Sequence, residues 1–204
     1  PTTFREDAQL LQDLLPGRTL CFGDPHGRCI QLFHTSRPYV PSRNDPTLEV
    51  LMHSIDEDVA KQFAPARLPE GGSLAQRLGI DTILPGFTTS EHVFKPAGYS
   101  LNGVRGEDFY TCHVTPEKMG SYVSFETNYD FRGQLAGLVE SIVDLFRPRS
   151  FDLVTFLPNA RPELAVGGYR LGERVVHTVN GYQVSYFQYS ISASGPQVSQ
   201  ELTS

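Results

Sequence analysis

Residues 94–128 read FKPAGYSLNGVRGEDFYTCHVTPEKMGSYVSFETN, and this stretch carries most of the evidence for the fold and the function. Alternating apolar and polar residues predict strands near Thr89–Phe94, Phe109–Thr115 and Ser121–Glu126. The pair Asn102-Gly103 favours a tight turn between the first two of them. We therefore expect consecutive antiparallel strands over this part of the chain.

The rest of the chain combines further strands with short helices. Helical spacing of apolar residues predicts helices at Phe4–Leu15, Asp58–Phe63 and Leu135–Leu145. The other predicted strands are Thr19–Phe22, Cys29–His34, Thr47–Ser54, Phe151–Leu157, Glu173–Val179 and Tyr182–Ile191. Hairpin turns are expected at Gly23–Gly27 and, most clearly, at Asn180-Gly181.

These elements predict an α+β fold, with largely antiparallel sheets and helices on the outside. The strands Phe151–Leu157 and Tyr182–Ile191 carry apolar residues on both sides. Because both faces of such strands must be buried, we expect a second sheet or a partner to pack against them.

Composition limits the possible functions. The 204 residues carry a net charge of −6, and the 17 Lys and Arg residues are scattered, which argues against a nucleic-acid partner and suits a cationic ligand. No apolar run is long enough to span a membrane, so we expect no membrane partner and a cytoplasmic protein. Cys21, Cys29 and Cys112 are predicted to be reduced thiols packed as small hydrophobic residues, without a disulfide framework.

The candidate chemistry centres on Ser100, His113, Glu117 and Glu126, a set of acid and base groups that needs no metal. No paired His or Cys spacing supports a zinc site. Each residue also has a simpler interpretation: His113 as a hydrogen-bonded structural histidine and Ser100 as an ordinary turn residue between two glycines. The five other histidines are assigned structural roles.

A second set of acids allows two interpretations. Asp45 and Glu49 share a strand face, and Glu126 lies elsewhere in the sequence. On the surface these carboxylates only solvate the protein; buried together, they form an anionic site for an amine. The sequence alone favours the surface interpretation.

Several short runs, in order, resemble the eukaryotic-type S-adenosylmethionine decarboxylases. They are Phe94, AGYSLNG at 97–103, HVTPE at 113–117 and SYVSFETN at 121–128. Weaker similarity extends over nearly the whole chain. The resemblance implies an αββα sandwich of two related halves, and a lyase of polyamine biosynthesis.

The resemblance also implies roles for individual residues. Phe94 would stack on the adenine of the substrate and Glu117 would hold the ribose hydroxyls. Ser100 and His113 would line the reacting centre and serve self-processing as the catalytic pair. Asp45, Glu49 and Glu126 would belong to an acidic cluster that binds an activating diamine in some family members.

The chain departs from the family at the cofactor. Such enzymes make a pyruvoyl group by cleaving themselves at a Glu-Ser-Ser site, and these 204 residues contain no such sequence. We therefore expect no cofactor in this chain. On the family's pattern, residues 1–63 would be the remnant of a truncated first half, 64–78 a linker, 79–191 a complete second half and 192–204 a flexible tail.

Three interpretations stay open. The chain is part of a decarboxylase whose N-terminal part is on another chain or otherwise missing; or it is a short, diverged member that uses His113 as acid and base for another small-molecule reaction, such as a cyclisation, isomerisation or decarboxylation. A third is a catalytically inactive regulatory paralogue. Because a sheet face should be left unshielded, we also expect a homo-oligomer or a missing N-terminal chain to cover it.

Overall fold

The computed structural model describes residues 3–40, 45–64, 72–117, 120–131, 133–158 and 162–192. In this part of the chain ten strands form two sheets, and every pair of neighbouring strands is antiparallel. The two-stranded sheet contains β1 (Gly17–Gly23) and β2 (Cys29–Thr35). The eight-stranded sheet has the order β4-β5-β6-β7-β3-β8-β10-β9.

The strands of the large sheet are β3 (Thr47–His53), β4 (Thr88–Val93), β5 (Tyr99–Arg105), β6 (Asp108–Thr115), β7 (Tyr122–Thr127), β8 (Ser150–Pro158), β9 (Tyr169–Val179) and β10 (Tyr182–Ile191). The helices are α1 (Phe4–Leu14), α2 (Glu57–Gln62), α3 (Leu74–Leu78) and α4 (Leu135–Phe146), with a 3-10 turn, η2, at Ile80–Thr82. The expected α+β class, with antiparallel sheets and outer helices, is confirmed.

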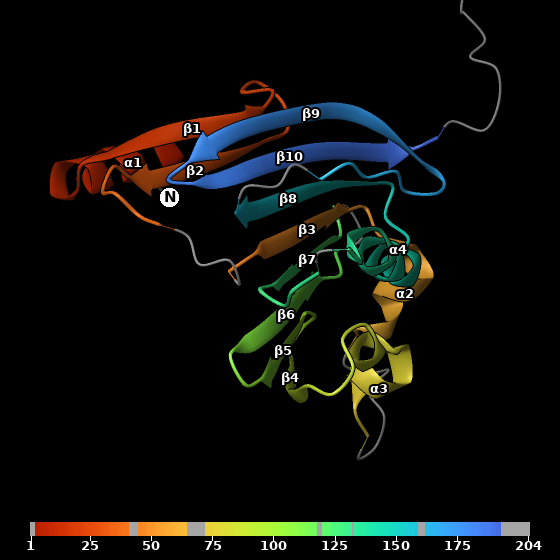
Figure 1. The fold of residues 1–204 in the computed structure, drawn as a ribbon. Helices are drawn as coiled ribbons and strands as arrows, with labels where there is room; N and C mark the ends of the chain where they lie inside the picture. Colours follow the sequence, from red (N-terminus) through yellow and green to blue (C-terminus); the bar gives the residue numbers. More distant parts are fainter. Residues whose placement is uncertain are drawn as a thin grey trace, which may run out of the picture.

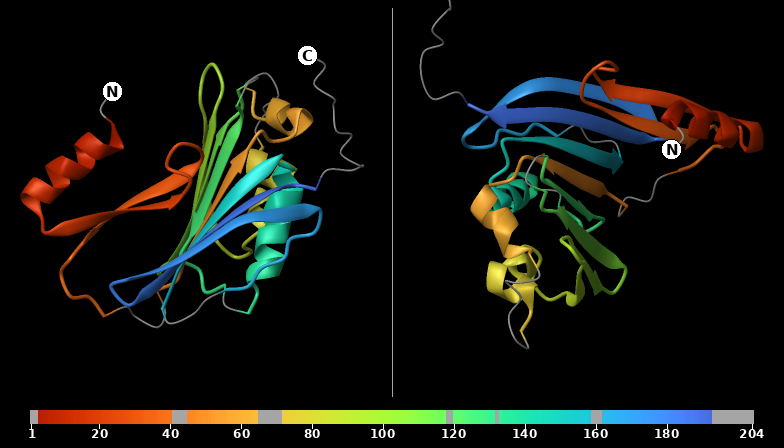
Figure 2. Two further views of the ribbon diagram at one scale, coloured as in Figure 1. Left: turned by 90° about the horizontal axis from the view of Figure 1, so that it is seen from above. Right: turned by 180° about the vertical axis from the view of Figure 1, so that it is seen from behind.

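The large sheet carries different layers on its two faces (Figure 1). Helices α2, α3 and α4 lie on one face, where the main hydrophobic core forms. The β1–β2 hairpin lies against the other face, on the half made by β8, β10 and β9, and α1 lies beside this hairpin (Figures 1 and 2). The expected second layer over Phe151–Leu157 and Tyr182–Ile191 is therefore present, and the chain itself supplies it.

Strand alternation explains both layers. In β3, Leu48, Val50 and Met52 are fully buried under the helices, while the residues between them are half-buried on the opposite face. The hairpin contributes Phe22, which is 2% exposed, to a second apolar cluster against the opposite face. Each face of the sheet thus has its own hydrophobic contacts.

One predicted turn is wrong. Asn102-Gly103 lies inside β5, and the chain reverses at Gly106-Glu107 instead, since Arg105 pairs with Asp108. Gly103 pairs with Tyr110 on β6, and a Cβ atom on Gly103 would come within 2.3 Å of the Tyr110 ring. The glycine is therefore needed for close approach of an aromatic ring, not for a turn.

Two other predictions concern the end of the chain and its turns. Asn180-Gly181 does form the hairpin between β9 and β10, with φ values of 47° and 87°. Positive φ at both central residues is the requirement that favours Asn-Gly in two-residue hairpins. The predicted flexible tail, 192–204, lies outside the described residues except for Ser192.

The first and second predicted parts of the chain, residues 1–63 and 79–191, share one sheet. Strand β3, from the range 1–63, lies in the middle of the large sheet, between β7 and β8 of the range 79–191. Residues 65–71 of the predicted linker lie outside the described residues, and α3 occupies its end. Long-range pairing of β3 thus joins the first range to the second in one sheet.

The cysteines differ from the sequence prediction. Cys112 is fully buried and packs as a small hydrophobic residue, as expected. Cys21 is exposed and Cys29 is only partly buried, both on the β1–β2 hairpin. The prediction that all three pack in the interior is therefore wrong, because the hairpin buries only its inner face.

Candidate functional site

The open part of the sheet collects polar side chains. Over β4, β5, β6, β7 and β3, the apolar residues point to the helices, and the alternate residues point to the face that no described element covers. Side chains directly opposite each other on paired strands lie on the same face. The strand register therefore decides which of the predicted site residues come together.

Ser100 and His113 are one such pair. They are directly opposite on β5 and β6, and Ser100 Oγ lies 3.0 Å from His113 Nδ1 in a hydrogen bond whose direction depends on the imidazole tautomer. His113 is exposed and Ser100 half-buried. Ser100 thus lies on a strand and not in a turn, and the hydroxyl and imidazole are within proton-transfer distance.

Phe94 lies at the same end of the sheet, directly after β4. Its ring is 48% exposed and meets the His92 ring edge-on, with 4.6 Å between the centroids. His92 is opposite Ser100 in the register, so the three residues are neighbours on the open face. The backbone N–H of Phe94 donates to the carbonyl of Gly98, which keeps the segment between them compact.

Glu117 is exposed, two residues beyond the end of β6. Among the described residues, no hydrogen bond or ion pair connects its carboxylate to Phe94, Ser100 or His113. The structure therefore brings Ser100, His113 and Phe94 together and leaves Glu117 at the margin of this group.

Of the three acids predicted for an amine site, two are paired. Glu49 on β3 is directly opposite Glu126 on β7. Burial, and then the nearby charge of Glu126, raise the pKa of Glu49 above its ordinary value. A bound cation between the carboxylates would relieve this repulsion, so the pair can hold an amine.

Asp45 lies apart from that pair, four residues along the chain from Glu49. Its Oδ2 accepts hydrogen bonds from the hydroxyls of Tyr182, at 2.5 Å, and Tyr39, at 3.3 Å. Burial and the Asp45 hydrogen bond raise the pKa of Tyr182, so this hydroxyl stays protonated as a donor. Asp45 therefore has its own partners at the end of the sheet.

A buried ionic network lies where the open and covered halves of the sheet meet. Asp152 on β8 is 1% exposed and accepts from Arg28 at 3.1 Å and from the Tyr186 hydroxyl at 3.1 Å. His53 Nε2 lies 3.2 Å from the other carboxylate oxygen. Arg28 comes from the turn of the β1–β2 hairpin, so this carboxylate ties the hairpin to the sheet.

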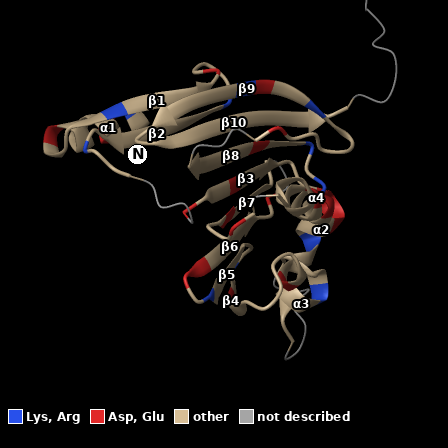
Figure 3. Cartoon of the chain, in the orientation of Figure 1, with Lys and Arg blue, Asp and Glu red and all other residues tan. Residues whose placement is uncertain are grey.

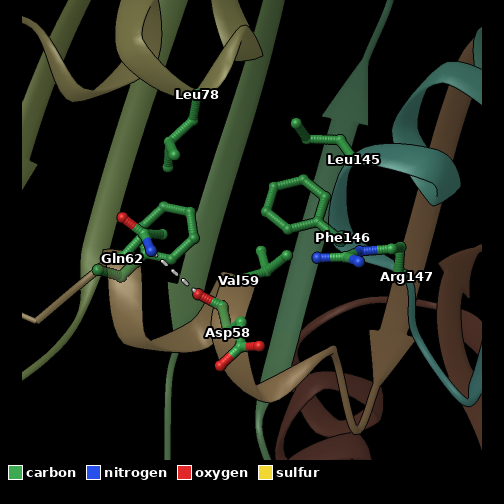
Figure 4. A pocket seen from close by; sticks show the side chains of 8 residues that line it. Asp58, Val59, Gln62, Leu78, Leu145, Phe146 and Arg147 are labelled. Carbon is green, nitrogen blue, oxygen red and sulfur yellow. Dashed lines mark hydrogen bonds between the residues drawn. The ribbon is translucent and has the colours of Figure 1, made fainter.

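Two pockets lie on the helix side, away from these residues. The one in Figure 4 holds about 210 Å³ between α2, α3 and α4, and is lined by Asp58, Val59, Gln62, Phe63, Leu78, Leu145, Phe146 and Arg147. The other, about 430 Å³, is lined by Ile83, Leu84, Tyr129, Phe131, Gly133, Gln134, Gly137, Leu138 and Ser141. Neither pocket is lined by a predicted site residue.

Charge and metal-binding potential complete the description. Figure 3 shows Lys and Arg on separate elements, among them α1, β1, β9, α2 and α3. Among the residues that the structure describes, no three His, Cys, Asp or Glu side chains gather as metal ligands. No described helix is long and apolar enough to cross a membrane.

Two histidines expected to be structural lie on the same face as the candidate site. His92 contacts Phe94 and lies opposite Ser100, and His53 contacts the buried Asp152. The position of His92 two residues before Phe94, within a strand, was a local signal that could have identified it. His53 had no such signal, because its partner Asp152 is 99 residues away in the chain.

Comparison with known proteins supports the family suggested by the motifs. The model of the adenosylmethionine decarboxylase family matches residues 2–190. The S-adenosylmethionine decarboxylase proenzyme of Xenopus laevis is 35% identical over 158 residues, which cover 76% of this chain and 47% of the Xenopus protein. That of Dictyostelium discoideum is 29% identical over 198 residues, covering 92% of this chain and 52% of its own length.

The fold also matches a solved structure. A crystal structure of the Trypanosoma brucei AdoMetDC-delta26 monomer aligns with a TM-score of 0.73 at 19% identity, over 95% of this chain and 79% of that one. This likeness confirms the expected sandwich-type fold. The chain spans about half the length of the curated relatives it matches. On the family match and these relatives, the chain belongs to the adenosylmethionine decarboxylase family.

Proposed function

We propose that this chain forms one wall of an S-adenosylmethionine decarboxylase-type site in polyamine biosynthesis and is not self-sufficient for the reaction. The observation that carries the proposal is the hydrogen bond between Ser100 and His113 on an open sheet face. Both residues match the family's motifs in sequence. A hydroxyl and an imidazole at 3.0 Å are arranged for proton transfer at a ligand above the sheet.

Phe94 and Glu117 hold the adenosyl part of the ligand in this proposal. The exposed Phe94 ring offers a face for the adenine, and its edge-on contact with His92 limits its rotation. The exposed Glu117 carboxylate accepts hydrogen bonds from two ribose hydroxyls. Adenine and ribose would then lie beside the Ser100–His113 pair.

The residues present fit a pyruvoyl group that comes from outside these 204 residues. Ser100 and His113 face away from the helices on a surface that no described element covers, so a second layer can bring such a group to them. A pyruvoyl carbonyl withdraws electrons from the substrate during decarboxylation. Within this chain, His113 then moves a proton at its imidazole and Ser100 orients that imidazole.

The paired carboxylates extend the proposal to an amine. Glu49 and Glu126 lie on the same face, and their mutual repulsion gives a cationic ligand a reason to bind. A diamine is the class of ligand that fits two adjacent carboxylates with a polar surface around them. Asp45, with its own tyrosine partners, would support this region from the end of β3.

Two other functions compete with this proposal. In one, His113 acts alone as acid and base in a reaction that needs no pyruvoyl group, which is chemically possible because the pair is already formed. In the other, the chain binds and regulates an active decarboxylase without catalysis. Each of these two functions predicts a different behaviour of the isolated chain from that expected for the main proposal.

The test has two parts, done first with the chain alone and then with an added partner. Titration calorimetry with S-adenosylmethionine should detect binding that Phe94→Ala weakens about fivefold or more, since a stacking contact contributes ~1 kcal/mol or more. Release of labelled carbon dioxide from S-adenosylmethionine should be absent with the chain alone. It should appear when the part of the Xenopus relative that this chain does not match is co-expressed with it.

The control is Val104→Ala, which changes an exposed residue on the same strand as Ser100 but at its far end. This variant should bind like the parent chain. Carbon dioxide release by the chain alone would support the pyruvoyl-independent function. Failure of Phe94→Ala to change an observed affinity would show that the ligand binds elsewhere.

A further inference from the structure

The β1–β2 hairpin places two thiols on one surface. Cys21 is opposite Gln31, and Cys29 is opposite Gly23. The two cysteines therefore occupy diagonal positions, with the Phe22–Ile30 pair between them. Their side chains share the outer face, because the intervening residues Phe22 and Ile30 pack inward against the sheet. Diagonal neighbours on one face of an antiparallel pair are close enough for long side chains to touch.

The side chains around the two thiols make them unequal. Gln31 Nε2 donates a hydrogen bond to Cys29 Sγ at 3.8 Å. Burial, the Cys29 thiol within hydrogen-bonding reach, and the charges of Asp24 and Glu173 raise the pKa of Cys21. The raised pKa makes Cys21 slower to form a thiolate, and we therefore assign Cys21 to the second step of the exchange.

We propose that Cys21 and Cys29 are a modification site, a dithiol that a small-molecule disulfide such as glutathione disulfide converts into an intramolecular disulfide. A disulfide requires Cα atoms within ~7 Å of each other. The diagonal Cα spacing is ~7–8 Å, so a small shift closes the bridge. Both cysteines lie next to the hairpin turn, where the strands can make this shift most easily.

The chemistry is a two-step thiol–disulfide exchange. The Cys29 thiolate attacks one sulfur of glutathione disulfide, forms a mixed disulfide and releases one glutathione thiolate. Cys21 then loses its proton and attacks the Cys29 sulfur, and the second glutathione thiolate leaves. The two protein thiols are oxidised, the glutathione disulfide is reduced, and two glutathione molecules carry away the two protons.

The third cysteine is a built-in control. Cys112 lies in the main core, 0% exposed, and burial raises the pKa of its thiol to about 12. It should not react in the folded chain. Only two of the three thiols should therefore disappear on oxidation, and they should disappear together.

The experiment treats the reduced full chain with glutathione disulfide, unfolds it in denaturant, blocks the remaining thiols with an alkylating reagent and measures the intact mass. The expected product has lost two hydrogens, carries one alkyl group and yields a cross-linked Cys21–Cys29 peptide after digestion. Cys29→Ser and Cys21→Ser should each accumulate a single glutathione adduct. Cys112→Ala should still form the bridge.

Three outcomes of this experiment would overturn the proposed Cys21–Cys29 bridge. A parent chain that carries glutathione on both hairpin cysteines, or that forms only disulfides between molecules, would overturn the proposal. So would a chain whose hairpin thiols stay free under conditions that oxidise a small reference dithiol. The melting temperature gives a second measurement: the bridged chain should melt higher than its reduced form, and Cys21→Ser should show no such difference.

Discussion

The two halves of the large sheet have the same strand pairing but differ in what lies on one face. Over β8, β10 and β9 this face is apolar and covered by the β1–β2 hairpin. Over β4, β5, β6, β7 and β3 the described elements leave the same face uncovered, and it carries Ser100, His113 and the paired Glu49 and Glu126. On this face, hydrophobic contacts therefore stabilise one half of the sheet, whereas the other half carries polar groups.

The largest effect on stability should come from removing a buried side chain between the hairpin and the sheet. Phe22→Ala removes a ring that is 2% exposed from the cluster between hairpin and sheet. It should lower the free energy of unfolding by about 3 kcal/mol, because the lost transfer energy adds to the cost of a cavity. Urea unfolding followed by circular dichroism measures this.

The matched control for Phe22 lies on the open half. Val104→Ala removes carbon atoms from a residue that is 55% exposed, and should change the free energy of unfolding by less than about 0.5 kcal/mol. Equal losses for the two variants would mean that the hairpin is not a stabilising layer, and the contrast between the halves would fail.

The boundary between the halves should give the next largest effect. Asp152→Asn removes the negative charge that Arg28 and His53 face. Because the buried carboxylate that Arg28 faces is lost, we expect about 2 kcal/mol of destabilisation in urea unfolding. Asp58→Asn, which disrupts an exposed pair with Lys61, is the control and should unfold like the parent. A parent-like Asp152→Asn would show that the network contributes nothing.

A smaller effect, of opposite sign, should come from the paired acids on the open half. The pKa of Glu49 is raised in the folded state by burial and by Glu126, so the folded chain holds this proton more tightly than the unfolded chain. Stability should therefore fall as the pH rises from the ordinary glutamate range towards neutrality. Glu49→Gln should remove that loss and stabilise the chain at pH 7 by a few tenths to about 1 kcal/mol.

Calorimetric melting across the pH range tests the sign. The advantage of Glu49→Gln should shrink below the ordinary glutamate pKa, where the parent is protonated in both states. A diamine should raise the melting temperature of the parent at pH 7 more than that of the variant. Glu107→Gln, at the exposed β5–β6 turn, should be insensitive to both. A stabilisation that does not vary with pH would rule out this explanation.

The smallest effect on stability should come from the Ser100–His113 pair. Ser100→Ala removes one hydrogen bond of a half-buried side chain and should cost less than about 0.5 kcal/mol. If the chain works in decarboxylation as proposed, His113→Gln should lower that activity in the co-expressed complex by ~10²-fold or more, because it removes the proposed proton-transfer group. A large loss of stability in either variant would indicate a structural role for this pair.

The sequence predicted the part of the site that comes from neighbouring strands close in the chain, but not the part that comes from distant strands. Ser100 and His113 were named from residue types and family motifs, and the β5–β6 register does bring them within hydrogen-bonding distance. The Glu49–Glu126 contact depends on β3 pairing with β7, across 77 residues of sequence. Residue spacing and composition do not predict that pairing. Asp45, which the sequence analysis grouped with these acids, instead contacts Tyr182 and Tyr39.

Local rules decided most of the elements. Alternation of apolar residues identified the strands near β6, β7, β8 and β10, because side chains on successive strand residues point to opposite faces. Asn180-Gly181 forms its predicted turn, because Asn and Gly tolerate the positive φ values that a two-residue hairpin requires. The same dipeptide at Asn102-Gly103 did not, because the Tyr110 ring on the neighbouring strand occupies the space above Gly103.

The sequence by itself determined the α+β class, the family, the Asn180-Gly181 hairpin and the Ser100–His113 candidates, since all of these depend on residues close in the chain. The tertiary structure alone decided the central position of β3, the pairing of Glu49 with Glu126, and the exposure of Cys21 and Cys29. The physical reason is that turn chemistry and alternation act over a few residues. Strand order and the burial of a hairpin face depend instead on contacts between distant segments.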